Sequence, residues 1–262
     1  MSPLLEARGV SKHFGEFRAL QDVSIAVNPG EFVAVVGPNG AGKTTLVNVL
    51  TGLLAPSTGQ VFFKGASISG AGPIALARRG MARTFQLVQI FPQLTVAETI
   101  AAAVVSQQQK QWRLFSALAQ DAVVHERVRA IAGSFGLSDR LQSLARMLSQ
   151  GEKKLLDVAS AFALAPQMIL LDEPTSGVST SEKHALMQTL IGAAKAAGVR
   201  AVILVEHDMD LVASYAQRIV ALSEGKVIAD LPPGPFFSDP HIIATVVGKR
   251  KAPDAVNQRS HR

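Results

Sequence analysis

Short apolar runs recur along the chain, and helical spacing of apolar residues follows them. Three such runs are Phe32–Val36, residues 168–171 and Ala201–Val205, and they consist only of aliphatic or aromatic side chains and methionine. Parallel strands that are covered on both faces have this composition. Apolar residues then recur at helical spacing at Leu46, Val49 and Leu50 and again at Leu186, Leu190 and Ala193. The alternation predicts an α/β fold built on a parallel sheet.

Other stretches have the pattern of antiparallel strands. Residues 4–10, 19–27 and 60–65 are short apolar segments bounded by turn residues, and they are expected to form a sheet of their own. Residues 218–222 and 226–229 flank Ser-Glu-Gly and predict a hairpin. Between the first two strands lie Lys12, His13, Phe14 and Gly15, and Phe14 stands there beside a glycine turn. The proline-rich residues 232–235 are expected to end the compact domain.

The middle of the chain is helical by pattern. Capping boxes, which begin helices, are predicted at Thr95 with Glu98 and at Ser149 with Glu152. Apolar residues on single helical faces follow both of them. The predicted organisation is a single domain over 1–247, with a catalytic α/β core and β subdomain at 1–86 and 162–247, a helical subdomain at 87–161, and a basic, flexible tail at 248–262.

Length and composition limit the class of protein. A chain of 262 residues, 48% of them hydrophobic, can bury a full core, and no apolar run predicts a membrane span or a signal peptide. The absence of cysteine excludes disulfides and thiolate metal sites. The formal charge is +6, of which +4 comes from five basic residues and one acidic residue in 248–262. The weakly basic body argues against a nucleic-acid groove, and the tail either contacts anionic lipid or stays in solvent.

A glycine-rich turn after the first parallel strand carries the first chemistry. It fits the pattern G-x-x-x-x-G-K-[ST] and opens a helix, so its backbone N–H groups and the helix N-terminus suit a polyphosphate. Lys43 is expected on the β and γ phosphates, and Thr44 is expected to give its hydroxyl to magnesium. The nucleotide-binding residues predicted here are Gly37, Pro38, Asn39, Gly40, Ala41, Gly42, Lys43, Thr44 and Thr45.

Ionisable residues directly follow the other two parallel strands. Asp172 and Glu173 come after residues 168–171, at the sheet edge where ligands of α/β proteins bind. Asp172 is expected to hold magnesium through water, and Glu173 to polarise the attacking water as a general base. His207 follows Ala201–Val205, and its neutral ring could contact a γ-phosphate. The helix that begins after Ser149 could hold a second phosphate, although its capping box alone also explains the residues.

Five elements in this order together resemble the ATP-binding subunit of an ABC transporter over almost the whole chain. They are the Walker A motif at 37–45, the Q-loop residue Gln86, the signature at 148–152, the Walker B motif at 168–172 with Glu173, and the switch histidine His207. The resemblance implies a P-loop NTPase with a RecA-like core, an antiparallel β subdomain and an inserted helical subdomain. It also implies an ATPase that uses ATP and Mg²⁺.

The resemblance assigns further roles and partners. Gln86 joins Asp172 and Thr44 at magnesium. Phe14 matches the aromatic residue that stacks on adenine. The alternative for a single aromatic residue is a position in the hydrophobic core. Ser149 and Gly151 would bind the ATP held by a second ATPase subunit, which is an identical chain or a paralogue. The implied assembly contains two transmembrane permease subunits and, indirectly, an extracellular solute-binding protein. It contains no specific nucleic acid and lies at the cytoplasmic face of the cell membrane.

The ATPases of branched-chain amino acid importers are similar at residues 80–86, 90–91, 94–96, 205–209 and 239–248. Urea or amide importers, lipopolysaccharide exporters and non-transport ABC ATPases that act on nucleic acid or ribosomes are the alternatives. Three positions depart from the usual pattern: Gln150 stands for glycine, Glu152 for glutamine, and Ser179 for aspartate or asparagine. These departures bear on the strength of the contact in trans and on the rate of hydrolysis.

Overall fold

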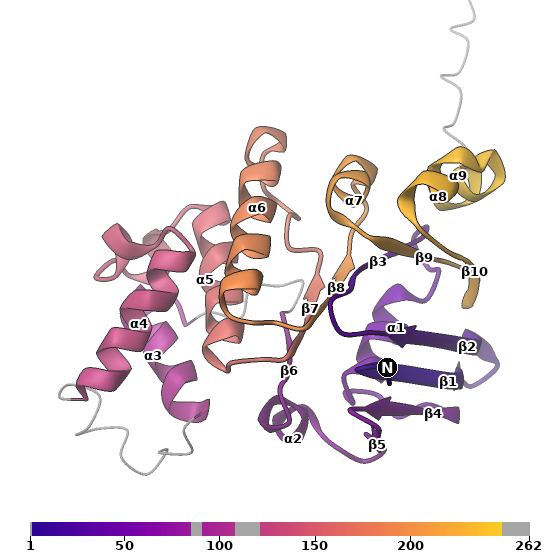
Figure 1. Ribbon diagram of the computed structural model, residues 1–262, viewed down its shortest axis with the longest axis horizontal. Coiled ribbons are helices and arrows are strands. Elements are labelled where there is room, and N and C mark those ends of the chain that lie inside the picture. Colours follow the sequence, from indigo (N-terminus) through magenta and orange to yellow (C-terminus); the bar gives the residue numbers. More distant parts are fainter. Residues whose placement is uncertain (1, 85–90, 108–120, 248–262) are drawn as a thin grey trace, which may run out of the picture.

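The computed structural model describes residues 2–84, 91–107 and 121–247. Two sheets organise these residues (Figure 1). One is antiparallel, with the order β2-β1-β4-β5, and the other has the order β10-β9-β3-β8-β7-β6. The antiparallel strands are β1 (Leu5–Phe14), β2 (Phe17–Val27), β4 (Thr58–Phe63) and β5 (Ala66–Ser67). The second sheet contains β3 (Phe32–Val36), β6 (Met81–Arg83), β7 (Met168–Asp172), β8 (Ala201–Val205), β9 (Arg218–Ser223) and β10 (Lys226–Leu231).

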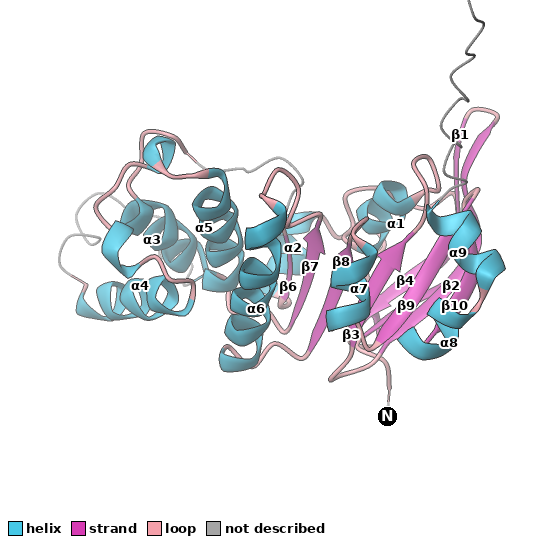
Figure 2. Ribbon diagram, turned by 90° about the horizontal axis from the view of Figure 1, so that it is seen from above, coloured by secondary structure: helices cyan, strands magenta, loops and turns pink. Residues whose placement is uncertain are grey.

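The second sheet is parallel except at its β10 edge, where β9 and β10 form the predicted hairpin. Its central strands are buried on both faces, which explains their unbroken apolar sequence. In β7, Ile169 and Leu171 join one hydrophobic cluster, whereas Met168 and Leu170 join another on the opposite face. This alternation places a helical layer on one side and α1 (Lys43–Leu50) with the antiparallel sheet on the other, as Figure 2 shows.

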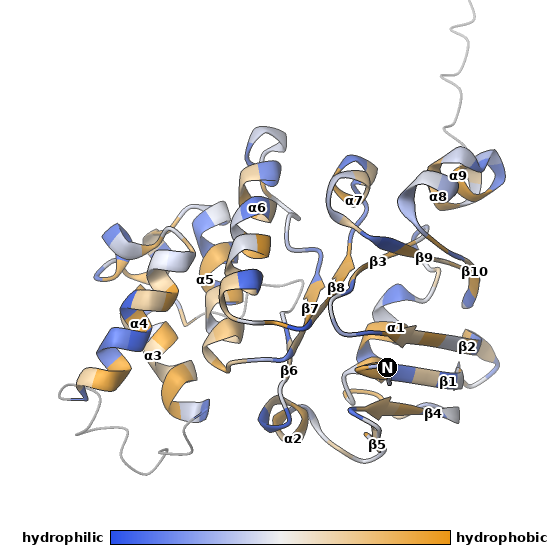
Figure 3. Cartoon of the chain, viewed as in Figure 1, coloured by the Kyte–Doolittle hydropathy of each residue, from blue (hydrophilic) through white to orange (hydrophobic). Residues whose placement is uncertain are grey.

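The remaining helices form two groups. The first packs on the sheet through one continuous hydrophobic cluster and comprises α3 (Val96–Gln107), α4 (Ala122–Ser134), α5 (Gln150–Ala163) and α6 (Thr180–Ala196), with the 3-10 turns η2 (Ser138–Arg140) and η3 (Ala145–Met147). The second comprises α7 (Met209–Tyr215), α8 (Pro233–Ser238) and α9 (Pro240–Val247). The short α2 (Pro73–Arg78) precedes β6. Apolar residues of the helices face the core, and polar residues of α4 and α6 lie outside (Figure 3).

The predicted α/β fold with an antiparallel β subdomain and a helical region is confirmed. The predicted capping boxes are also present. The Thr95 Oγ1 accepts from the Glu98 N–H at 3.1 Å and the Glu98 carboxylate accepts from the Thr95 N–H at 2.7 Å, and Ser149 and Glu152 make the same reciprocal pair. The predicted boundary between 161 and 162 lies inside α5, which continues to Ala163.

Two expectations from the sequence are wrong. The first strand does not end at Val10, because β1 continues to Phe14, which pairs with Phe17 across the hairpin beside the glycine turn. The proline-rich residues 232–235 do not end the compact domain either. Pro233 begins α8, where the fixed φ of proline suits the first helical turn, and α8 buries Phe236 completely. No helix within the described ranges is long and apolar enough to cross a membrane.

Candidate active site

The glycine-rich turn joins the end of β3 to α1 in the arrangement that the sequence predicts. Gly42 lies just before the helix with φ of 100°, and among the described residues no side chain caps the first N–H groups of α1. A Cβ on Gly42 would lie 2.5 Å from the carbonyl oxygen of Ala19, and one on Gly37 would lie 2.2 Å from that of Leu222. Glycine is therefore required at both positions, because neighbouring backbone occupies the space of a side chain. Helix N-terminal N–H groups in such a turn form an anion site.

Lys43 is buried at the centre of this turn. Its Nζ donates to the carbonyl oxygens of Gly37 at 2.7 Å and Pro38 at 3.0 Å. Burial lowers the pKa of Lys43, while the nearby carboxylates of Glu173 and Asp172 act in the opposite direction. The ammonium thus lies inside the turn and within the field of both carboxylates, where it can attract a polyphosphate. Thr44, the next residue, is exposed at the start of α1.

Asp172 ends β7 and is paired with a residue that sequence reasoning missed. Its Oδ2 accepts from Arg83 Nη2 at 2.7 Å, and only 6% of the Asp172 side chain and 8% of the Arg83 side chain are exposed. Arg83 also donates to the Asn48 side chain on α1 at 2.6 Å. One guanidinium thus joins β6, β7 and the P-loop helix. The sequence did contain a signal for this pair, since Arg83 belongs to a short apolar segment. A charged side chain that is buried there requires a partner of opposite charge.

Glu173 and His207 meet just beyond the ends of β7 and β8. The two atoms that face each other are His207 Nε2 and Glu173 Oε1, at 2.5 Å. An ionised carboxylate only accepts hydrogen bonds, so the Nε2–H of His207 donates to Glu173. The His207 side chain is 44% exposed and the Glu173 side chain 17%. A carboxylate oriented by an imidazole beside a phosphate-binding turn has the composition of a general-base site.

The donor set near Asp172 and Thr44 suits magnesium. Both residues offer oxygen, the ligand type that Mg²⁺ prefers, and Mg²⁺ in nucleotide sites takes one or two protein groups together with phosphate oxygens and water. The described residues contain no cluster of three or more histidine, cysteine or acidic residues that would form an all-protein metal cage. A shared protein and phosphate site therefore fits the residues present. Gln86, the other predicted magnesium residue, lies outside the described residues.

The remaining predicted residues lie on other elements, α5 and β1. Ser149 is exposed at the start of α5, and its hydroxyl accepts from the Glu152 N–H at 3.2 Å. Its own N–H donates to the Glu152 carboxylate and its carbonyl oxygen accepts from the Lys153 N–H, so the described hydrogen bonds of Ser149 stay within the start of α5. Phe14 ends β1 with half of its surface exposed, and the Lys12 Nζ lies 5.3 Å from the centroid of its ring. The exposed ring excludes the alternative of a core phenylalanine.

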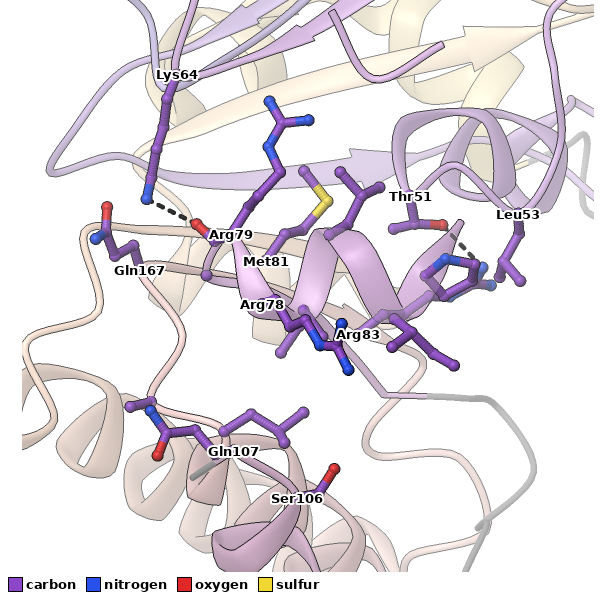
Figure 4. Close-up of a pocket in the computed structure, with 18 residues that line it drawn as sticks. Thr51, Leu53, Lys64, Arg78, Arg79, Met81, Arg83, Ser106, Gln107 and Gln167 are labelled. Atoms are coloured by element: carbon purple, nitrogen blue, oxygen red, sulfur yellow. Dashed lines mark hydrogen bonds between the residues drawn. The ribbon is translucent and has the colours of Figure 1, made fainter. Parts of the chain in front are cut away.

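A pocket of about 610 Å³ opens between α2 and β6 on one side and the ends of α3 and α5 on the other (Figure 4). Its lining includes Lys64, Arg78, Arg79 and Arg83 and, among the described residues, no aspartate or glutamate. Lys64 Nζ donates to the Arg79 carbonyl oxygen at 2.7 Å, and burial followed by repulsion from Arg200 and Arg79 lowers the pKa of Lys64. The pocket is therefore cationic, and through Arg83 it adjoins Asp172.

Comparison with known proteins shows the family of the chain. The family model described as ABC transporter matches residues 20–176. The high-affinity branched-chain amino acid transport ATP-binding protein LivG of Escherichia coli K12 is 32% identical over 255 residues, which cover 94% of this chain and 98% of LivG. The probable LivG of Methanocaldococcus jannaschii is 31% identical over 258 residues, with 94% and 98% covered.

Solved structures agree in fold over nearly the full length. A nucleotide-free ATP-binding cassette from an ABC transporter superposes with a TM-score of 0.80 at 30% identity, covering 94% of this chain and all of the other. The ADP conformation of an ATP-binding cassette of an ABC transporter superposes with a TM-score of 0.82 at 29% identity, covering 95% and 100%. The P-loop, the carboxylates of Asp172 and Glu173, and these likenesses support the same conclusion. The chain belongs to the ABC transporter family and is a nucleotide-binding ATPase cassette of that family.

Proposed function

We propose that the chain powers a membrane importer for branched-chain or related hydrophobic amino acids. The observation that supports this solute class is the likeness to LivG proteins, which extends over 94% of this chain in both a bacterium and an archaeon. The solute itself does not contact an ATPase subunit. The geometry of the site therefore supports only the hydrolysis step, and the assignment of the solute class depends on the likeness to LivG proteins.

For hydrolysis, we assign the residues as follows. The P-loop N–H groups and Lys43 bind the phosphates, and Phe14 stacks on adenine with its exposed face. Thr44, Asp172 and Gln86 would hold Mg²⁺, which supplies charge neutralisation to the phosphates when bound. Glu173 accepts a proton from the attacking water, and His207 orients the Glu173 carboxylate through its Nε2–H.

A second cassette completes the site in this proposal. Ser149 is exposed at the start of α5, and its hydrogen bonds stay within that helix start. In a dimer of two such chains, or of this chain with a paralogue, the start of α5 would offer its N–H groups to the nucleotide of the partner. Gln150 and Glu152 leave these backbone donors in place, and Glu152 also stabilises the helix start.

The cationic pocket supports a permease as the further partner. It lies between the β6 strand that leads to Gln86 and the helical region, and Arg83 on its wall bonds to Asp172. An acidic loop or helix of a permease subunit fits its charge. Binding there would hold the chain at the cytoplasmic face of the membrane as a peripheral subunit.

Uptake into proteoliposomes tests this function. The chain is reconstituted with permease subunits and a solute-binding protein of a branched-chain amino acid importer from the same source, and ATP-dependent uptake of radiolabelled leucine and urea is compared. We expect leucine uptake that requires ATP and is lost in Glu173→Gln. Uptake of urea but not leucine would move the chain to the urea importer branch, and ATPase activity stimulated only by nucleic acid would overturn the transport function.

A further inference from the structure

Glu206 is a buried carboxylate that the hydrolysis scheme above does not use. It lies directly after β8, and only 4% of its surface is exposed. Burial of a carboxylate is costly unless hydrogen bonds satisfy its oxygens. Glu206 Oε1 accepts from the Thr175 hydroxyl at 2.5 Å and from the Thr175 N–H at 3.3 Å, and Oε2 accepts from the His207 N–H at 3.1 Å. Both carboxylate oxygens thus accept hydrogen bonds. Oε1 binds the turn after β7, and Oε2 binds the turn after β8.

These two turns carry the residues of the proposed general-base site. Thr175 lies two residues after Glu173, and His207 is the residue after Glu206. The last paired residues of the parallel strands are Asp172 and Val205, so the ladder of strand hydrogen bonds ends just before the site. Beyond the ladder, the Glu173 N–H donates to the Val205 carbonyl oxygen at 3.0 Å. Glu206 adds the side-chain bonds that hold the two turns together.

The turn after β7 requires such support. Glu173 has a φ of 48°, a left-handed conformation that costs free energy for a residue with a side chain and persists only where its surroundings hold it. Lys154 of α5 contributes from the other side, where its Nζ approaches the Glu173 carbonyl oxygen at 3.5 Å. Burial lowers the pKa of Lys154, and the attraction of Asp157, Glu173 and Glu206 opposes this shift. A buried cation thus partly balances the buried carboxylates.

We propose that Glu206, through Thr175, is a positioning residue that holds His207 against Glu173. The inference rests on the proposed function in that it takes Glu173 as the base. Because the Glu206 bonds end on Thr175 and on the His207 backbone, loss of the carboxylate frees the imidazole from its bonded position beside Glu173. Nucleotide binding depends on the P-loop, whereas the described hydrogen bonds of the Glu206 carboxylate go to Thr175 and His207.

Steady-state ATPase kinetics of the full chain test the proposal. Glu206→Gln keeps the size of the side chain, but its single oxygen cannot accept from both the Thr175 N–H and the His207 N–H, as the two carboxylate oxygens do. We expect a fall in kcat of about tenfold with KM for ATP within about twofold, the pattern of a misoriented catalytic group. Thr175→Val, which removes only the hydroxyl, should show the same pattern, and Thr175→Ser should lose less. Glu126→Gln, an exposed glutamate on α4, is the matched control.

A double-mutant cycle separates positioning from general structural support. If Glu206 acts through His207, Glu206→Gln should change kcat by less than about twofold once His207 is alanine. A full tenfold loss in that background, or a loss of kcat in Glu206→Gln with no loss in Thr175→Val, would overturn the proposal. Glu173→Gln is measured in parallel: if it keeps full turnover, the assignment of the base fails, whatever Glu206 does.

Discussion

Replacement of Arg83 by methionine removes one partner of the ion pair buried between β6 and β7. Arg83 and Asp172 are joined at 2.7 Å, and less than a tenth of either side chain is exposed. Methionine keeps much of the aliphatic length and leaves the Asp172 carboxylate buried without its guanidinium. The bond from Arg83 to Asn48 on α1 is lost as well.

The magnitude follows from burial. Loss of one partner of a buried pair costs about 3–5 kcal/mol, because the remaining charge stays desolvated. Lys43 lies within the field of Asp172 and offsets part of this cost, so we expect the low end, about 3 kcal/mol. For a chain of this size, that corresponds to a fall in Tm of about 6–12 °C.

Thermal unfolding followed by circular dichroism measures the effect, and the chain offers a matched control. Arg8 and Glu6 also pair at 2.7 Å, but the Arg8 side chain is 63% exposed. Exposed pairs contribute little to stability, so Arg8→Met should leave Tm nearly unchanged. Equal falls in Tm for Arg83→Met and Arg8→Met would refute the reasoning, because the two pairs differ in burial and not in length.

Three further predictions concern the nucleotide site and the signature helix. Gly42→Ala should lower the free energy of unfolding in urea by about 1–3 kcal/mol more than Gly40→Ala. A Cβ at Gly42 would lie 2.5 Å from a backbone oxygen, whereas a Cβ at Gly40 would have none of the described atoms within 4 Å. Hydrogen bonding from the Ser149 N–H lowers the pKa of Glu152. This carboxylate therefore stabilises the fold above its ordinary pKa, and the stabilisation is lost as pH falls through the lowered value. Glu152→Gln, which can still complete the cap, should weaken the pH dependence of Tm below the ordinary glutamate pKa of about 4.3. Phe14→Ala should raise the Kd for ATP at least about fivefold through lost stacking, whereas Phe17→Ala, on the neighbouring strand, should not.

Each of these predictions has a contrary result. Both glycines have a positive φ. Equal destabilisation by the two glycine variants would therefore show that the loss of stability comes from the positive φ and not from the close approach of backbone atoms. An unchanged pH dependence in Glu152→Gln would remove the carboxylate from the cap. Equal ATP affinity in Phe14→Ala and the parent chain, measured by titration calorimetry, would remove Phe14 from the nucleotide site.

Local signals in the sequence predicted much of the fold. The P-loop, the strand before Asp172 and Glu173, and both capping boxes depend on residues within a few positions of one another, and all of them are present. The extension of β1 to Phe14 was missed because it depends on pairing with β2 across the hairpin. The continuation of the compact domain past Pro233 was missed because a buried Phe236 anchors it.

Contacts between distant residues could not be predicted in the same way. Arg83 and Asp172 are 89 positions apart, and Thr175 and Glu206 are 31 apart. Neither pair belongs to a motif with fixed spacing. A charged residue within or directly after an apolar run does indicate that a buried partner must exist, but only the order of the strands shows which residue that partner is. The cationic pocket likewise depends on α2, β6, α3 and α5 meeting in space.

The ATPase rate of the purified chain and of Glu173→Gln, measured with ATP and Mg²⁺, tests the central claim most directly. The account predicts that the parent chain hydrolyses ATP, and that Glu173→Gln binds ATP with similar affinity but loses at least about a hundredfold in kcat, the contribution typical of a general base. Turnover of Glu173→Gln at the parent rate, with ATP binding intact in both, would contradict it.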